Sequence, residues 1–125
     1  MKVERLHHVS LLVTDLERAK AFYGGVLGLQ ETKRPPFGFP GAWYQIGEDQ
    51  IHLIVYPEKA PVPDGIDTKD AHLALRVANF WQAVERLEQH NVEVVKKPQN
   101  LTDWPQAYCT DPDGNVIELN AAGVD

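Results

Sequence analysis

Two stretches of the chain decide its fold because they match each other: His8-Val-Ser-Leu-Leu-Val-Thr-Asp-Leu16 and His72-Leu-Ala-Leu-Arg-Val-Ala-Asn-Phe80. Each begins with a histidine and continues as an apolar run that is typical of a strand. Each then reaches a side chain that can cap a helix, Thr14 or Asp15 in the first stretch and Asn79 in the second. Nearer the end of each half, Ile51-His52-Leu53 matches Ile117-Glu118-Leu119 at almost the same spacing. The chain is therefore interpreted as a tandem duplication.

Each half has the element order βαβββ. In the first half the patterns predict strands at 9–13, 30–34, 43–46 and 50–56, and a helix at 16–23 that Gly24, Gly25 and Gly28 stop. In the second half they predict strands at 71–77, 92–96, 107–110 and 116–120, and a helix that Asn79 caps and His90-Asn91 ends.

These elements predict an α+β fold built from two tandem modules. The modules are residues 1–56 and 71–125, and the Pro-rich segment 57–70 reads as a linker because its prolines cannot easily pair in a sheet. We expect one structural domain overall, with a curved, barrel-like mixed sheet around a cleft and the helices on its outer face.

Composition narrows the class of protein. The 125 residues suffice for one ordinary domain, and 43% apolar residues can build its core. The formal charge of -6, without a large basic cluster, argues against nucleic acid as a partner. No apolar run approaches the roughly 20 residues that span a bilayer and no signal-peptide core is visible, so we expect a cytoplasmic protein without a membrane partner. The single cysteine, Cys109, can form no disulfide within the chain and is interpreted as a buried strand residue.

Four side chains with metal-binding chemistry occupy matching places in the two halves. They are His8, His52, His72 and Glu118. Because strand side chains alternate, each points away from its apolar neighbours and onto the face that the helices leave open. Burying three imidazoles and a carboxylate together without a cation would leave polar groups unpaired. The set therefore predicts a divalent-metal site. His7, expected to point away from His8, and His90, expected at a helix end, have no counterpart and are given no role.

Substrate contacts are predicted from the same alternation and from one loop. Arg76, Tyr56 and Asn120 share the ligand face, and Arg76 is either an anion-binding group or part of a salt bridge at the rim. Phe37, Phe39 and Trp43 bracket the Pro-rich loop of the first half, where they either line the cleft or form a dimer core. The candidate substrate-binding residues are thus Arg76, Tyr56, Asn120, Trp43, Phe37 and Phe39.

The whole chain resembles the vicinal oxygen chelate superfamily, the group that includes glyoxalase I, fosfomycin-resistance, bleomycin-resistance and extradiol-dioxygenase proteins. The resemblance lies in the opening 8–23, in Val26-Leu-Gly28-Leu, and in Asp111-Pro112-Asp113-Gly114-Asn115-Val-Ile-Glu118-Leu near the end. It implies one divalent transition metal per site, Zn, Ni, Mn or Fe, held by the four ligands named above. It also implies a small-molecule substrate and a homodimer whose sites combine modules.

The resemblance implies a glyoxalase-like lyase or isomerase that grips two adjacent substrate oxygens and stabilises an enolate or alkoxide, with Glu118 as the catalytic carboxylate. His52 departs from the glyoxalase I pattern, in which a second carboxylate or glutamine is common, so other reactions stay open. His8, His72 and Glu118 also fit a thiol transferase or an Fe(II) extradiol-type dioxygenase. A non-catalytic, bleomycin-resistance-like binder is the remaining alternative, and the intact ligand set argues against it.

Overall fold

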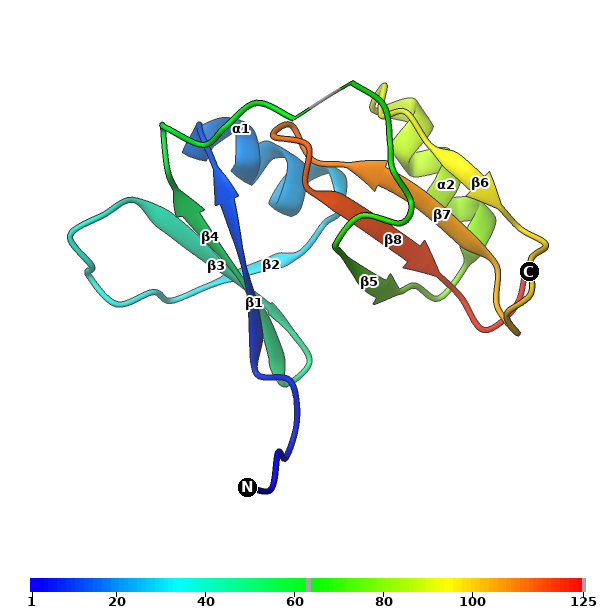
Figure 1. The fold of residues 1–125 in the computed structure, drawn as a ribbon, viewed down its shortest axis with the longest axis horizontal. Helices are drawn as coiled ribbons and strands as arrows, with labels where there is room; N and C mark the ends of the chain where they lie inside the picture. Colours follow the sequence, from blue (N-terminus) through cyan, green and yellow to red (C-terminus); the bar gives the residue numbers. More distant parts are fainter. Residues whose placement is uncertain (63, 125) are drawn as a thin grey trace. The chain divides into compact units, whose positions relative to one another are not determined.

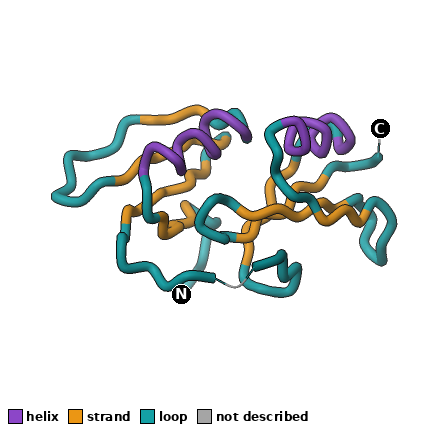
Figure 2. Tube along the Cα trace, turned by 90° about the horizontal axis from the view of Figure 1, so that it is seen from above, coloured by secondary structure: helices purple, strands orange, loops and turns teal. Residues whose placement is uncertain are grey.

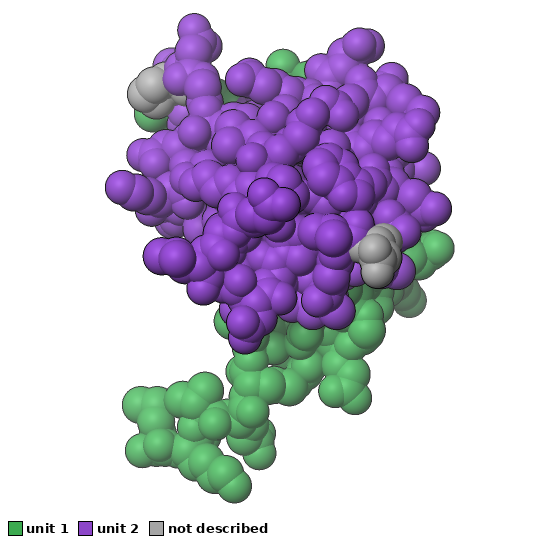
Figure 3. Space-filling view, turned by 90° about the vertical axis from the view of Figure 1, so that its right-hand side faces the viewer, with its two compact units in different colours: residues 1–60 green, residues 61–125 purple. Residues whose placement is uncertain are grey.

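The computed structural model describes residues 1–62 and 64–124, and these form two compact units, Met1–Ala60 and Pro61–Asp125 (Figures 1 and 3). Pro63 of the predicted linker and Asp125 at the end of the predicted second module lie outside the described residues. The elements of each unit follow the order that the duplication predicts.

The first unit is a four-stranded mixed sheet with one helical segment. Its elements are β1 (His8–Val13), α1 (Leu16–Lys20), η1 (Ala21–Val26), β2 (Gln30–Thr32), β3 (Gly41–Ile46) and β4 (Asp49–Val55). The strand order is β1-β4-β3-β2, in which β1 and β4 are parallel and the other neighbours antiparallel. The first and last strands of the module therefore lie side by side at the sheet edge.

The second unit repeats this arrangement. Its elements are β5 (His72–Arg76), α2 (Phe80–Gln89), β6 (Val95–Lys97), β7 (Gln106–Thr110) and β8 (Val116–Asn120). The strand order β5-β8-β7-β6 again makes the first and last strands parallel neighbours. The prediction of an α+β fold with two βαβββ modules is confirmed. Among the described residues the eight strands form two separately hydrogen-bonded sheets, one per unit, and not a closed barrel.

In each unit the helix covers one face of its own sheet (Figure 2). The hydrophobic core of the unit consists of side chains from the helix and from this face of the sheet. The buried core side chains of the first unit are Val13, Ala19, Phe22, Tyr23, Ala42, Tyr44, Ile51 and Leu53. Those of the second include Phe80, Val84, Leu87, Ala107, Cys109, Ile117, Leu119 and Ala121. Strand residues between these positions project from the other face. None of the described helices combines the length and apolarity needed to cross a bilayer.

The caps agree with the sequence, but the first helix ends differently. Asp15 accepts a hydrogen bond from the Arg18 backbone N–H at 2.9 Å, and Asn79 does the same for Gln82. Of the three glycines predicted to stop this helix, Gly24 and Gly25 do not, and only Gly28 does. The helix widens into the π-helical turn η1, in which the Leu27 N–H donates to the Phe22 carbonyl, five residues back, at 2.8 Å. Termination falls to Gly28, whose φ of 72° suits a residue without a Cβ.

Candidate metal centre

The first pair of predicted ligands comes from β1 and β4. The parallel register places Ser10 beside His52, and Ser10 shares a face with His8 by alternation. The His8 and His52 rings stack with their centroids 4.0 Å apart and their planes 17° apart. The duplicated strand pair thus brings its two imidazoles together, as the sequence predicts within this half.

Trp43 covers the other side of His52. It is the direct β3 partner of His52, and the two rings are nearly parallel, at 4° and 4.0 Å. His52 is therefore held between an indole and an imidazole, and only 8% of the residue is exposed. Burial lowers the pKa of His52, and the neighbouring imidazoles of His8 and His7 and the guanidinium of Arg34 lower it further. A ring kept neutral has a lone pair available for a cation.

The second pair comes from β5 and β8. His72 Nε2 lies 3.4 Å from Glu118 Oε1, and the Glu118 residue is only 6% exposed. His72 Nδ1 lies 2.7 Å from the Asp70 carbonyl oxygen, which can only accept a hydrogen bond. Nδ1 therefore carries the proton, and in the neutral ring Nε2 presents its lone pair beside the carboxylate. A backbone carbonyl in this role is a common second partner of metal-binding histidines.

The spacing of the second pair suits two ligands of one ion. Two ligand atoms that are each about 2.1 Å from a metal lie about 3.0 Å apart at a right angle and about 3.4 Å apart at the tetrahedral angle. The separation of His72 Nε2 and Glu118 Oε1, 3.4 Å, falls in this range. Imidazole nitrogen with carboxylate oxygen is a donor set that Zn, Ni, Mn and Fe accept. His72 and Glu118 therefore fit as two ligands of one divalent transition metal.

Glu118 is oriented by hydrogen bonds from its own unit. Asn120 Nδ2 donates to Oε2 at 2.7 Å, and Gln106 Nε2 donates to Oε1 at 3.4 Å. Tyr108 hydrogen-bonds to the same carboxylate, and burial together with this bond and the Glu118 charge raises the pKa of Tyr108 to about 12. Oε2 is held by the closer amide, so Oε1 is the oxygen presented to His72.

The predicted substrate residues of the second half belong to this network. Arg76 Nε donates to Asn120 Oδ1 at 2.6 Å, which turns the Asn120 amide nitrogen toward Glu118. The Arg76 guanidinium also lies 6.0 Å from the centre of the Trp104 ring. Arg76 and Asn120 thus both help to orient the candidate ligand Glu118. Strand alternation alone cannot predict this connection.

In the first half the aromatic loop residues extend the stack of rings outward from His52. The Phe37 ring lies 6.0 Å from Trp43 and stacks on Phe39 at 5.4 Å, with 9° between the two phenyl planes. Phe37 and Phe39 are 45% and 44% exposed, and the Arg34 guanidinium lies 4.9 and 5.0 Å from their centres. Tyr56 follows the end of β4 and is exposed.

Three further predictions, for His7, His90 and Cys109, can be compared with the structure. His7 does not point away from His8: its Nδ1 lies 2.9 Å from His8 Nδ1, because β1 begins only at His8 and strand alternation does not reach His7. His90 ends α2 as expected, and its Nδ1 donates to the Arg86 carbonyl at 2.8 Å. Cys109 is a buried β7 residue as predicted, and burial followed by the Asp111 charge raises the pKa of its thiol to about 12.

Each unit contributes two of the four predicted ligands. Within either unit, the described residues contain no group of three His, Cys, Asp or Glu side chains arranged around one ion.

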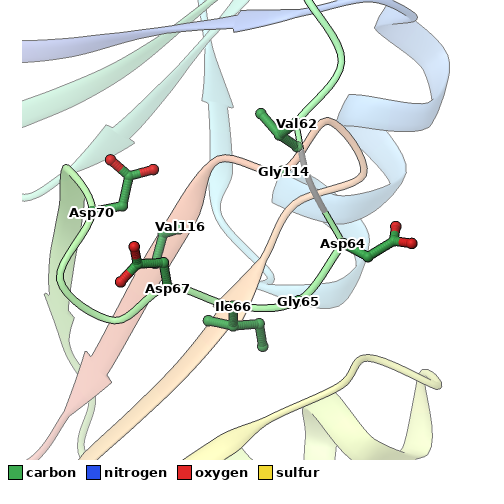
Figure 4. Close-up of a pocket in the computed structure, with 8 residues that line it drawn as sticks. All are labelled: Val62, Asp64, Gly65, Ile66, Asp67, Asp70, Gly114 and Val116. Carbon is green, nitrogen blue, oxygen red and sulfur yellow. The ribbon is translucent and has the colours of Figure 1, made fainter.

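A cavity of about 430 Å³ in the second unit lies among other residues (Figure 4). Its lining is Val62, Asp64, Gly65, Ile66, Asp67, Asp70, Gly114 and Val116. None of these is a predicted ligand, although the Asp70 carbonyl accepts the hydrogen bond from His72.

Several residues that complete the candidate centre were not predicted. Gln45, Gln50, Gln106 and Tyr108 each hydrogen-bond to a candidate ligand or to its partner. Gln50 and His52 are two residues apart on one strand, so alternation places them on the same face. That signal was present in the sequence. The cross-strand contacts of Gln45, Gln106 and Tyr108 depend on strand register, which one sequence does not determine.

Comparison with known proteins agrees with this architecture. Residues 5–119 match the sequence model of the Glyoxalase/Bleomycin resistance protein/Dioxygenase superfamily. The chain belongs to this superfamily. Among solved structures, a glyoxalase family protein from Bacillus anthracis superposes with a TM-score of 0.82 at 27% identity, covering 97% of both chains.

Several similar proteins carry the names of different enzymes. The chain is 31% identical to lactoylglutathione lyase of Salmonella typhimurium, over 92% of this chain and 90% of that protein. It is 30% identical to the glutathione transferase FosA of Serratia marcescens, over 98% and 84% of the two chains. It is 28% identical to the metallothiol transferase FosB of Staphylococcus epidermidis, over 96% and 83%. A lactoylglutathione lyase and a metallothiol transferase are thus both among the proteins that this chain resembles.

Proposed function

We propose that this chain is a divalent-metal-dependent, glyoxalase-like enzyme acting on a small substrate with two adjacent oxygens. The ligands are His8, His52, His72 and Glu118. The supporting observation is that His72 Nε2 lies 3.4 Å from Glu118 Oε1 across the parallel strands β5 and β8, a spacing that suits two ligands of one ion. We propose that a homodimer combines these pairs around Zn, Ni, Mn or Fe, either within one chain or between two.

The proposed chemistry divides between the ion and the chain. When bound, the metal supplies a Lewis acid for negative charge that develops on the substrate oxygens. Glu118, the one carboxylate of the ligand set, moves the proton between neighbouring carbons, and its Oε1 is the atom free of the Asn120 hydrogen bond. Asn120 and Arg76 hold that carboxylate in place. Phe37 and Phe39, exposed beside the ring stack, contact the apolar part of the substrate.

A metal analysis tests the proposal. Protein purified without added metal should contain close to one equivalent of a first-row transition metal per chain by elemental analysis. His72→Ala and Glu118→Ala should each remove most of it, because each deletes one ligand side chain. His90→Ala is the matched control, since His90 hydrogen-bonds only locally at the end of α2. Wild-type protein that purifies without metal and also fails to take up Ni, Zn, Mn and Fe would refute the proposal in favour of a non-catalytic binder.

A thiol transferase is the second candidate function, and one observation favours it. His8, His72 and Glu118 form a set of two histidines and one carboxylate, which also suits this function. The names of the FosA and FosB relatives point the same way. Turnover of the hemithioacetal of methylglyoxal and glutathione supports the first function. Thiol addition to fosfomycin without hemithioacetal turnover supports the second. Turnover of catechols only after anaerobic loading with Fe(II) would replace both with a dioxygenase.

A further inference from the structure

A chain of side-chain amides leads from a turn carbonyl to His52. Gln45 Nε2 donates to the Gly47 carbonyl oxygen at 2.8 Å, in the turn between β3 and β4. Gln50 Nε2 donates to Gln45 Oε1 at 2.8 Å, and Gln50 Oε1 lies 2.7 Å from His52 Nε2. We call these three hydrogen bonds the glutamine relay.

The relay has only one possible direction. The Gly47 carbonyl has no hydrogen to give, so the Gln45 amide must turn its NH₂ group toward it and its oxygen toward Gln50. Gln50 must then donate to Gln45, which leaves the Gln50 oxygen facing His52. An amide oxygen can only accept, so His52 Nε2 carries a proton. In the neutral imidazole the single lone pair is then on Nδ1.

The register of β3 and β4 places the two glutamines and His52 next to one another. Gln45 and Gln50 are direct partners in the antiparallel β3–β4 register, and Gln50 shares its face of β4 with His52. The imidazole is also restrained from tilting, because Trp43 and His8 stack on its two sides at 4.0 Å each. Orientation and tautomer of this ring are therefore both determined before any ligand arrives.

His72 is held in the opposite tautomer. Its Nδ1 donates to the Asp70 carbonyl at 2.7 Å, so its lone pair lies on Nε2, 3.4 Å from Glu118 Oε1. The two units thus present different ring nitrogens, although their strands follow the same order. Each ring achieves this through a neighbouring group that only accepts.

We propose that Gln45 and Gln50 are positioning residues that keep the proton of His52 on Nε2, so that this ring binds a divalent cation through Nδ1. The cation-binding part rests on the proposed function above. The tautomer part concerns the protein without metal, so the two parts are tested separately.

Imidazole ¹⁵N resonances of the full-length, metal-free protein test the tautomer part at about pH 8, where a free imidazole is neutral. His52 should show an unprotonated Nδ1 and a protonated Nε2, and His72 the reverse. Gln50→Glu retains the acceptor and should leave the His52 pattern unchanged. Gln50→Lys offers only donors and should move the unprotonated resonance to Nε2. Gln30→Lys, on an exposed residue of β2 in the same unit, is the charge control and should change nothing.

Gln45→Leu guards against a Gln50→Lys protein that does not fold. Without the amide that orients Gln50, His52 should become a mixture of both tautomers. A wild-type His52 with an unprotonated Nε2 would overturn the proposal. So would a folded Gln50→Lys or Gln45→Leu protein with the wild-type His52 pattern, since the glutamines would then have only a packing role.

Zinc titration of the same sample tests the cation part. Zinc should shift the Nδ1 resonance of His52 and the Nε2 resonance of His72. A shift of His52 Nε2 instead means that zinc displaces Gln50 and overturns the inference while the proposed function survives. If zinc, nickel and manganese move no imidazole resonance, the proposed function and the cation part both fail, and the metal-free spectrum alone decides the tautomer part.

Discussion

Asn120 illustrates how a single side chain prepares the candidate carboxylate. Its oxygen accepts from Arg76 Nε at 2.6 Å and its nitrogen donates to Glu118 Oε2 at 2.7 Å. Because an arginine can only donate, the Asn120 amide cannot turn over without losing both bonds. A guanidinium thus orders a buried carboxylate through one intervening amide.

Replacing Asn120 should weaken both the fold and metal binding. Asn120→Ala removes the closer donor to a buried charge, so we expect a loss of about 1–3 kcal/mol in the free energy of unfolding. Metal affinity should fall roughly 10–100-fold, the usual effect of losing a residue that orients a ligand. Urea unfolding of the metal-free protein and calorimetric titration with zinc measure the two effects.

Gln106 provides the matched comparison for Asn120. Its amide lies 3.4 Å from Glu118 Oε1, a longer contact than the 2.7 Å bond from Asn120. Gln106→Ala should therefore cost less than Asn120→Ala in both measurements. Equal effects of the two substitutions would show that the Asn120 bond has no special part in orienting Glu118.

Residue types and alternation predicted which face Asn120 and Arg76 occupy, but not what they touch. The sequence makes both residues candidates for substrate contact, with a salt bridge at the rim as the alternative for Arg76. In the structure Arg76 donates to Asn120 and Asn120 donates to Glu118, because the parallel β5–β8 register makes Arg76 and Asn120 partners. Register arises from the packing of whole strands and is not visible in any single residue.

Among the elements, the β3–β4 hairpin depends on one glycine at its open end. A Cβ on Gly41 would overlap the backbone oxygen of Leu53 on β4 and come within 3.0 Å of the Arg34 side chain. The carbonyl belongs to a paired strand and cannot move aside cheaply. The hairpin carries Trp43 and His52, so this close approach matters to the candidate centre.

Gly41→Ala should destabilise the protein by roughly 1–3 kcal/mol through this overlap. Gly38→Ala, in the preceding loop, is the control because a Cβ there meets no atom within 4 Å. It should change stability by less than about 0.5 kcal/mol. Urea unfolding measures both variants, and a Gly41→Ala protein as stable as Gly38→Ala would show that the strands separate at little cost.

The helices show which element features local sequence can predict. The N-caps at Asp15 and Asn79 need only a side chain three residues before its backbone partner, so both were predictable. The end of the first helix was not. Gly24 remains helical with its Cα beside the Tyr44 ring, where an added Cβ would lie 3.5 Å away. Packing against the sheet thus continues the helix past a glycine that local preference would use as a stop.

For the whole molecule, a buried thiol and two buried tyrosine hydroxyls predict a loss of stability at alkaline pH. Burial raises the pKa of Cys109 from 9.0 to about 12 and that of Tyr44 from 10.0 to about 12, and Tyr108 reaches a similar value. The folded state therefore keeps protons that the unfolded state releases. These contributions are fully present below about pH 9 and are lost as the pH rises toward about 12.

Urea unfolding at several pH values between about 8 and 11 should show this decline. Tyr44→Phe should make it shallower, because phenylalanine has no proton to lose. Trp81→Phe, an exposed change on α2 without a titrating group, should leave the slope of the wild type. A free energy of unfolding that stays level to pH 11, or a Tyr44→Phe slope equal to that of the wild type, contradicts the prediction.

The sequence by itself determined the duplication, the βαβββ order, the α+β class and the pairing of ligand types at matching strand positions. Those features follow from local hydrophobic periodicity and from the comparison of the two halves of the chain with each other. A single sequence contains all of this information. The tertiary structure decided the ring stack around His52, the tautomers of His52 and His72, and the donors that orient Glu118. These depend on strand register and on side-chain directions across neighbouring strands, which only the packed sheets specify.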